Sequence, residues 1–394
     1  MAGGAWLGID RTTCRILQSF VRGPESLCFG VRGHFRAFKS GDMSPQSKMS
    51  AKSITIVGGG LAGLTLGIGL RRQGVPVTIW ETGHYPRHRV CGEFISGRGQ
   101  ESLSRLGLRG LLERAGAVNA ATAAFFSTTQ SSPPRALPAR AICLSRFTMD
   151  HALAVEFKKL GGELQEGQRW HEEDFGEGMV RATGRRAQAK ENGMRWFGLK
   201  VHARNVELIA DLEMHVSPRG YVGLCRVDGG AVNICGLFRR RDDEDQAPQN
   251  RREWLHGEPG SPLNRRLAVA EFEENSFCAV AGISLRPQRA ALRAECCVGD
   301  AITMIPPVTG NGMSMAFESA EMAMAPLASW SHGESPWAET RQTIARQCDA
   351  VFGRRLAWAK WLQRMMLTPS LQSVLVRFVT RSGWFWRTAF ERTR

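Results

Sequence analysis

Hydrophobic positions follow two different periods along the chain. Residues 54–57 and 77–80 are short apolar runs that predict buried strands, and the apolar residues of 61–73 between them recur at helical spacing. This order predicts a strand–helix–strand unit with parallel strands. From about 195 to 240, apolar and polar residues alternate in the segments RWFGLKVHA, DLEMHV, GYVGLCRV and AVNICGLF, which predicts a sheet with one buried face.

The rest of the chain continues this mixture of helices and strands. An Asp-Gly-Gly sequence at 228–230 separates the last two alternating segments and predicts a hairpin turn. Helical spacing predicts helices over 101–117 and 148–160, and another over 312–330 that follows a buried strand at 296–298. The predicted fold class is therefore α/β.

Composition narrows the class of protein without naming an activity. Hydrophobic residues make up 43% of the 394 residues and charged residues 23%, which argues against wholesale disorder and against a multi-spanning membrane protein. The ten cysteines include no C-x-x-C pair, so we expect a reducing, cytoplasmic location and no metal site. The net charge of +15 is spread along the chain without a nucleic-acid module, so we expect no nucleic-acid partner.

The two ends of the chain differ from its middle. Residues 1–50 carry scattered arginines and no sustained apolar period, so we expect a disordered extension, or translation from upstream of a true start at Met43 or Met49. Their basic, acid-poor composition leaves an organelle transit peptide open. Residues 331–394 are expected to be helical, and their tail interleaves Trp, Leu and Phe with Arg. That tail is either a helical cap with a basic solvated face or a surface for peripheral membrane contact.

A glycine-rich turn follows the first predicted strand. Gly58, Gly60 and Gly63 form the pattern G-x-G-x-x-G between a strand and a helix. The first glycine of this pattern permits a tight turn, the second lets a pyrophosphate approach the backbone, and the third lets helix and strand pack closely. Glu81 closes the second strand, where a carboxylate can accept ribose hydroxyls. The unit predicts a dinucleotide site and leaves both NAD and FAD open.

Two further stretches distinguish between these cofactors. ETGHYPRHRVCGEFIS (81–96) and CCVGDAITMIPPVTGNGMSMAFESA (296–320) together resemble the superfamily of FAD-dependent monooxygenases and geranylgeranyl-reductase-like flavoproteins. The resemblance implies an FAD-binding Rossmann-like domain of the glutathione-reductase type, with an inserted, mainly antiparallel β-sheet substrate domain and a C-terminal helical tail. It places the FAD-binding domain at 51–186 and 276–330, the substrate domain at 187–275 and the C-terminal helical region at 331–394.

The resemblance also implies which residues form the FAD site. Asp300, after Gly299, would bind the ribityl hydroxyls, and backbone N–H groups at 310–312 would stabilise negative charge on the reduced flavin. Cys91 would line the pocket or donate a proton, and Glu93 would orient local groups, whereas the ordinary role of a free cysteine is that of a small buried residue. The predicted catalytic residues are Cys91 and Glu93, and the predicted cofactor-binding residues are Gly58, Gly60, Leu61, Ala62, Gly63, Glu81, Arg89, Arg146, Gly299, Asp300, Pro306, Gly310, Asn311, Gly312 and Met313.

The chemistry implied by the resemblance takes more than one form. We expect FAD with NAD(P)H as reductant, and an oxygen-using monooxygenase that hydroxylates a hydrophobic small molecule. The alternative is a reductase of alkene bonds, because YPRHRVCGEFIS is similar to the reductase signature Y-P-R-x-K-x-C-G-E, with Arg89 where Lys is common. Segment 220–238 departs from that branch's Tyr-x-Trp-Gly-Phe-Pro pattern but retains Tyr221, and the halogenase element Trp-x-Trp-x-Ile-Pro is absent. A degraded motif at 181–190, with Thr183 where Asp is usual, leaves a non-catalytic flavin-binding protein open.

Overall fold

The chain divides into two parts, Met1–Lys48 and Met49–Arg394. The computed structural model describes residues 51–368, except 129, 172–174, 186–192 and 242–250, together with residues 371, 387, 388 and 391. All of these belong to the second part. The predicted N-terminal extension and nearly all of the Trp- and Arg-rich tail beyond residue 368 therefore lie outside the described residues.

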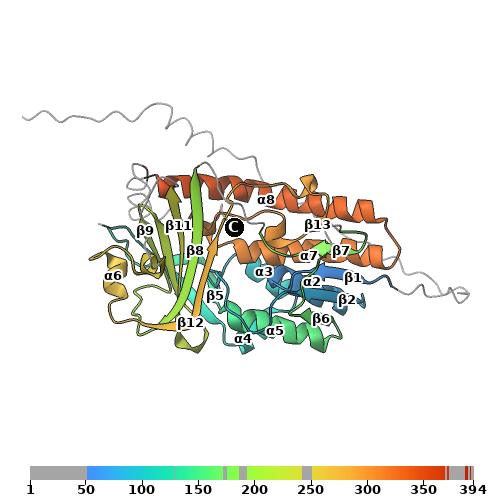
Figure 1. Ribbon diagram of the computed structural model, residues 1–394, viewed down its shortest axis with the longest axis horizontal. Coiled ribbons are helices and arrows are strands. Elements are labelled where there is room, and N and C mark those ends of the chain that lie inside the picture. Colours follow the sequence, from blue (N-terminus) through green and yellow to red (C-terminus); the bar gives the residue numbers. More distant parts are fainter. Residues whose placement is uncertain are drawn as a thin grey trace, which may run out of the picture. The chain divides into compact units, whose positions relative to one another are not determined.

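The predicted strand–helix–strand unit forms the centre of a parallel sheet, sheet A (Figure 1). β1 (Ile54–Val57) and β2 (Val77–Glu81) pair in parallel and are connected by α2 (Leu61–Arg72). The strand order is β13-β7-β1-β2-β6, and every neighbouring pair is parallel. The remaining strands of sheet A are β6 (Glu163–Glu166), β7 (Met179–Arg181) and β13 (Cys296–Cys297).

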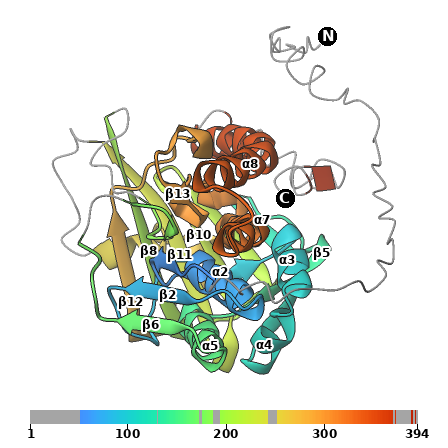
Figure 2. The ribbon, with the colours of Figure 1, turned by 90° about the vertical axis from the view of Figure 1, so that its right-hand side faces the viewer.

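Helices enclose α2 on the sides that sheet A leaves free. α5 (Arg146–Lys159) and α7 (Gly312–Ser331) both pack against α2, and α8 (Trp337–Leu367) packs against α7. Figure 2 shows α7 and α8 end-on, with α2 next to α7. Because it is surrounded in this way, α2 is buried from Leu61 to Leu70, which explains why its sequence is apolar almost all round. No helix in the described part of the chain combines the length and the apolar character needed to cross a membrane.

The alternating segments belong to an eight-stranded sheet, sheet B, with the order β12-β8-β11-β10-β9-β4-β5-β3. Neighbouring strands are antiparallel except β4 and β9, which pair in parallel. The predicted hairpin turn joins β10 to β11, and Gly229 and Gly230 in it have φ of 67° and 76°. The strands are β3 (Phe94–Ile95), β4 (Val118–Phe126), β5 (Arg135–Cys143), β8 (Met194–Arg204), β9 (Leu212–Ser217), β10 (Gly220–Arg226), β11 (Val232–Arg241) and β12 (Glu271–Ala281).

Sheet B takes strands from a wider stretch of chain than the predicted substrate domain at 187–275. β3, β4 and β5 come from residues 94–143, which the family resemblance places in the FAD-binding domain. They join the sheet where β4 pairs with β9, about ninety residues later in the chain, and Asp211 accepts hydrogen bonds from the backbone N–H groups of Ala121 and Thr122 there. The sequence of a strand does not show which distant strand it pairs with, so the sequence alone did not predict this contact.

One predicted helix is two helices in the structure. We predicted a single helix over 101–117, and the chain forms α3 (Arg98–Arg105) and α4 (Arg109–Arg114) instead. The break lies at Gly107, whose φ of 62° is left-handed and cannot continue a helix. One further short helix, α6 (Pro262–Arg266), packs on the face of sheet B that contains Val201 and Leu224.

A buried ion pair joins α7 to α8. The guanidinium of Arg355 on α8 donates to both carboxylate oxygens of Glu318 on α7, at 2.7 and 2.9 Å. The two side chains are only 3% and 6% exposed. Each charge is therefore compensated almost entirely by the other.

We expect the substitution Arg355→Met to lower the free energy of unfolding by about 3–5 kcal/mol, because it leaves the buried Glu318 charge without a partner. The double substitution Glu318→Leu, Arg355→Met removes both charges and should recover most of that loss. Urea denaturation of the wild-type protein and the two variants measures both values. A double variant as unstable as the single one would show that packing around Arg355, and not its charge, maintains the contact.

Candidate functional site

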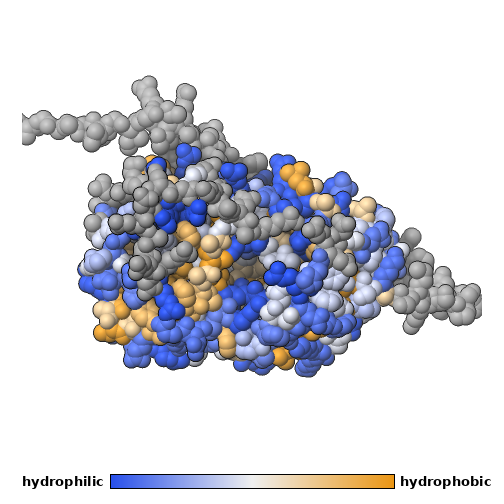
Figure 3. Space-filling view, viewed as in Figure 1, coloured by the Kyte–Doolittle hydropathy of each residue, from blue (hydrophilic) through white to orange (hydrophobic). Residues whose placement is uncertain are grey.

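A large cavity lies between the two sheets. Its volume is about 900 Å³, near the upper end of the range of roughly 300–1,000 Å³ for small-molecule sites. Residues of sheet A, α2, α7, sheet B and the C-terminal part of α8 all line it. The space-filling view is hollowed near its middle, and hydrophobic side chains border the hollow on the side of sheet B (Figure 3).

The glycine turn after β1 forms one end of this cavity. Gly58 has a φ of 111°, and a Cβ there would lie 2.4 Å from the carbonyl oxygen of Ala182. A Cβ on Gly63 would lie 2.0 Å from the carbonyl oxygen of Gly58, so neither position has room for a side chain. At Gly60 a Cβ would meet no atom within 4 Å, and Gly60 lines the cavity. The first and third glycines therefore allow close backbone contacts, and the second leaves space for a ligand beside α2.

The start of α2 can receive an anion from this space. Its N-cap residue is Gly60, which has no side chain to occupy the free N–H groups, and its first turn contains no acidic residue. Unpaired N–H groups at a helix N-terminus and the positive end of the helix dipole both favour phosphate. A cavity wall of this kind fits the diphosphate of a dinucleotide.

The Glu81 carboxylate connects the glycine turn to the loop that follows β2 through hydrogen bonds. It accepts hydrogen bonds from the backbone N–H of Gly59 and of Gly83, each at 3.0 Å, and it forms ion pairs with Arg87 and Arg89. Burial alone would raise the pKa of Glu81, but the charges of Arg89 and Arg87 lower it below its ordinary value. Glu81 lines the cavity, where we predicted a ribose contact, and its oxygens already hold the turn in place.

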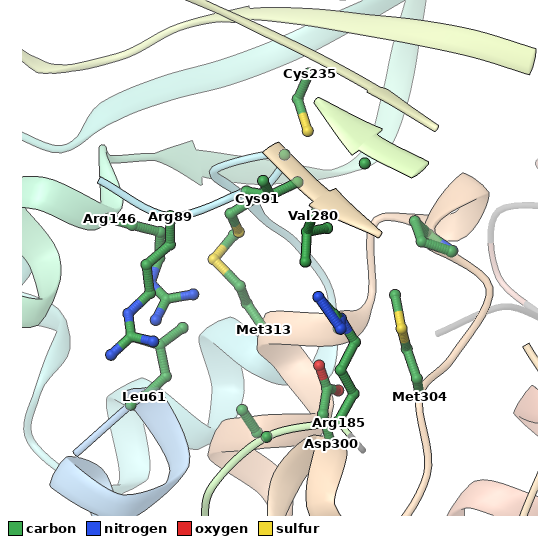
Figure 4. Close-up of a pocket in the computed structure, with 18 of the residues that line it drawn as sticks. Leu61, Arg89, Cys91, Arg146, Arg185, Cys235, Val280, Asp300, Met304 and Met313 are labelled. Carbon is green, nitrogen blue, oxygen red and sulfur yellow. The ribbon is translucent and has the colours of Figure 1, made fainter. Parts of the chain in front are cut away.

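Arg89 and Arg146 meet at Asp150, which is in the second turn of α5. Arg146 donates to both carboxylate oxygens of Asp150 at 2.7 and 2.8 Å, and Arg89 Nε donates to Oδ2 at 3.1 Å. The Asp150 side chain is fully buried, so these two cations supply its neutralising charge. Because Arg89 also pairs with Glu81, the network connects β2 to α5. Both arginines line the cavity, near Leu61 (Figure 4).

A second carboxylate enters the cavity from the segment after β13. The short 3₁₀ turn η4 (Gly299–Ala301) packs closely against α2, because Gly299 has a φ of 62° and a Cβ there would lie 2.9 Å from the Cβ of Ala62. Asp300 lines the cavity beside Arg185 (Figure 4). Burial raises the pKa of Asp300 to about 6, and the charges of Arg146 and Arg185 oppose that rise.

The start of α7 forms the wall next to Asp300. The 3₁₀ turn η5 (Pro307–Thr309) leads into Gly310, whose φ is 65°, and α7 begins at Gly312. No side chain caps this helix, and its first turn contains no acidic residue. Gly310, Gly312 and Met313 line the cavity, and a Cβ on Gly312 would meet no atom within 4 Å. This is a second helix N-terminus able to stabilise negative charge.

Cys91 and Glu93, the two predicted catalytic residues, have different surroundings. Cys91 lines the cavity, and burial raises the pKa of its thiol although the charge of Arg146 opposes the rise. Glu93 is fully buried, has a φ of 53°, and is not among the residues that line the cavity. Its carboxylate accepts a hydrogen bond from the backbone N–H of Arg146 at 2.8 Å and contacts Nε2 of His202 at 2.7 Å and Nζ of Lys200 at 3.4 Å. Glu93 thus anchors the loop to α5 and β8.

Most of the predicted cofactor-binding residues come together in the cavity. Asn311 is fully buried behind the start of α7, and the carbonyl group of Pro306 accepts the N–H of Thr309 within the turn. Gly63, Glu93, Pro306 and Asn311 do not line the cavity, and they shape the segments that do. The predicted residues that line it are Gly58, Gly60, Leu61, Ala62, Glu81, Arg89, Cys91, Arg146, Gly299, Asp300, Gly310, Gly312 and Met313.

Arg185 and the residues of sheet B line the cavity but are not among the residues predicted from the sequence. Arg185 belongs to the degraded motif at 181–190, and the signal that could have found it is its place just after a strand of a parallel sheet, where ligands bind. The pairing register of β9, β10 and β11 aligns cavity-lining residues in two rows across sheet B. The rows are Val216, Tyr221 and Leu237, and Met214, Gly223 and Cys235. Within the described ranges, no group of three or more His, Cys, Asp or Glu could hold a metal ion.

Comparison with known proteins agrees with this geometry. Residues 51–204 match the family described as the FAD binding domain, and no curated protein matches the chain. The flavin-dependent brominase Bmp2 is similar in structure, with a TM-score of 0.64, 17% identity, and coverage of 86% of this chain and 97% of that chain. PqsL from Pseudomonas aeruginosa, in complex with 2-aminobenzoylacetate, has a TM-score of 0.64 and 14% identity, covering 83% of this chain and 99% of its own.

A flavoprotein/dehydrogenase from Cytophaga hutchinsonii has a TM-score of 0.65 and 14% identity, covering 86% of this chain and 95% of its own. At identities this low, the similar structures show only that the fold is shared. The match of residues 51–204 to the FAD binding domain indicates the cofactor. The predicted fold class is confirmed, and the predicted FAD-binding domain is confirmed over residues 51–204. Residues 51–204 therefore belong to the FAD binding domain family, and the chain shares its fold with the flavin-dependent brominase Bmp2 and with PqsL.

Proposed function

We propose that this protein is an NAD(P)H- and oxygen-dependent monooxygenase that hydroxylates a hydrophobic small molecule. The observation that supports this most is the continuity of one cavity, from the glycine turn and Asp300 to the apolar face of sheet B. A cofactor held at the first end would face a substrate held at the second. The finer parts of the proposal are the reductant, the use of oxygen and the nature of the substrate.

The residues of the cavity fit FAD. The space at Gly60 and the start of α2 would receive the diphosphate, and the Asp300 carboxylate would accept hydrogen bonds from ribityl hydroxyls. The start of α7, from Gly310 to Met313, would stabilise negative charge on the ring. When bound, FAD supplies the redox chemistry, accepting a hydride from NAD(P)H and passing electrons to oxygen.

The substrate end of the cavity favours an apolar ligand. Its walls include Phe125, Phe126 and Met214 from sheet B, and α8 closes it with Leu362 and Met366. Walls of this kind bind apolar surface and exclude water from the reacting atoms. The structural neighbours support the class of reaction, since one structure of PqsL is described as a probable FAD-dependent monooxygenase.

An alkene reductase remains the second candidate, and Cys91 favours it. Reduction of an alkene needs a proton donor next to the cofactor, and burial keeps the Cys91 thiol protonated in the cavity. We propose that Cys91 donates a proton in either reaction. We also propose a cytoplasmic location, because all eight cysteines in the described residues are free thiols.

We expect the full-length protein to be reconstituted with FAD and to turn over NADH or NADPH repeatedly only when oxygen is present, because without oxygen each chain can oxidise NAD(P)H only once. A panel of aromatic and polyketide-like substrates, with ¹⁸O₂ and mass spectrometry, should give a product that carries one labelled oxygen. Saturation of an alkene without oxygen would instead support the reductase. A protein that binds FAD and turns over no substrate under either condition would contradict both proposals.

The substitution Gly60→Ala tests the placement of FAD. Because a Cβ at Gly60 meets no protein atom, the apo protein should lose no more than about 1 kcal/mol of stability. The Cβ would occupy the approach to the backbone N–H groups, so the Kd for FAD should rise at least tenfold, about 1.4 kcal/mol. Gly353→Ala, in open space on α8, is the matched control and should leave the Kd unchanged. Equal FAD affinities in wild type and Gly60→Ala would place the diphosphate elsewhere.

The substitution Cys91→Ala tests the proton donor. General acid catalysis contributes about 10²–10⁴-fold, so turnover should fall roughly 100-fold while FAD affinity stays the same. Turnover is measured by substrate-dependent oxidation of NAD(P)H, and FAD affinity by quenching of flavin fluorescence. If Cys91→Ala turns over at the wild-type rate, Cys91 only lines the pocket.

A further inference from the structure

Two opposite charges in the cavity have no direct partner of their own. Arg185 follows β7 and is half-buried in the cavity wall, and in the described part of the chain no hydrogen bond or ion pair engages its guanidinium. Asp300 lies beside it, and the same range of residues supplies no hydrogen-bond donor to its carboxylate (Figure 4). Burial lowers the pKa of Arg185, and the charge of Asp300 opposes that shift.

Two arginines act on the Asp300 carboxylate, and of these two Arg185 is the one that is not already paired with another carboxylate among the described residues. The charges that act on Asp300 are those of Arg146 on α5 and of Arg185 after β7. Arg146 already donates to both carboxylate oxygens of Asp150, through Nε and Nη2. Its charge is therefore largely balanced, whereas Asp300 is the carboxylate that acts on Arg185.

The helix that packs against η4 adds no uncompensated charge. α7 contacts η4, and its two carboxylates are engaged by partners elsewhere. Glu318 pairs with Arg355, and Glu321 pairs with Arg105. The ionisation of Asp300 consequently depends on its burial and on the two arginines.

We propose that Arg185 is a positioning residue of the cofactor site, whose charge keeps the partly buried Asp300 carboxylate ionised so that it can accept hydrogen bonds from the ribityl hydroxyls of FAD. A protonated carboxyl group offers fewer acceptor sites than a carboxylate and weaker hydrogen bonds. The inference concerns FAD binding by this chain and does not depend on which reaction the flavoprotein catalyses.

The pH dependence of FAD binding follows from the pKa of Asp300. The pKa of Asp300 in the apo protein is raised to about 6, so the carboxylate is ionised above that pH and protonated below it. Because FAD prefers the ionised form, its affinity should be constant above about pH 6 and fall as the pH is lowered further, by at most tenfold per pH unit. Without Arg185 the Asp300 pKa rises again, and the fall begins at a higher pH.

The experiment is a titration of the full-length apo protein with FAD, followed by flavin fluorescence between pH 5 and 9. The wild-type profile should bend near pH 6. Arg185→Gln should move that bend to a higher pH, because it removes a charge that favours the carboxylate, and should approach wild-type affinity at pH 9. Arg185→Lys keeps the charge and should restore the wild-type profile. Asp300→Asn should bind weakly at every pH and show no bend.

Two outcomes would overturn the proposal. A uniform loss of affinity in Arg185→Gln at every pH would show that Arg185 contacts the cofactor directly, and an unchanged profile would show that it has no part in the site. The double variant Arg185→Gln, Asp300→Asn gives an independent check, because removing Arg185 should have no further effect on the profile once Asp300 cannot ionise. Circular dichroism of each apo variant confirms that it is folded before it is titrated.

Discussion

The close approach of three backbone segments, made possible by glycines, sets the geometry of the whole site. At Gly58 the turn after β1 touches Ala182 at the end of β7, and at Gly299 the segment after β13 touches α2. These segments are more than a hundred residues apart from one another in the sequence. A side chain at either glycine would separate them by more than the packing of a protein interior allows. The space that becomes the cofactor end of the cavity exists only because they meet.

Charges in the cavity are arranged around this contact. Asp150 and Glu81 each pair with two arginines, and Glu93 pairs with Lys200 and contacts the ring of His202. Each of these carboxylates holds a segment of the wall in place. Asp300 differs because no side chain donates to it within the described structure, and it is the carboxylate left for a ligand. The carboxylates that already have protein partners stabilise the wall of the site, whereas Asp300 has acceptor oxygens available to a ligand.

Local backbone requirements made part of this site predictable from sequence. Gly58, Gly63 and Gly299 each meet a steric demand that only glycine satisfies, and such demands leave a recognisable pattern of residues. The same holds for the strand–helix–strand unit, whose apolar periods give the bounds of β1 and α2 closely. The pairing of β4 with β9 and the entry of Arg185 into the cavity depend on contacts between distant segments. The place of Glu93 in a motif predicts that it orients local groups, and only the structure shows which groups it contacts, the backbone N–H of Arg146 and the ring of His202.

The claim on which the account depends is that this cavity holds FAD. Its most direct test is the flavin content of the full-length protein, purified with added FAD and then freed of unbound cofactor by gel filtration. The account predicts a yellow protein with one FAD released per chain on denaturation. A colourless protein that takes up no FAD, although it is folded, would contradict it.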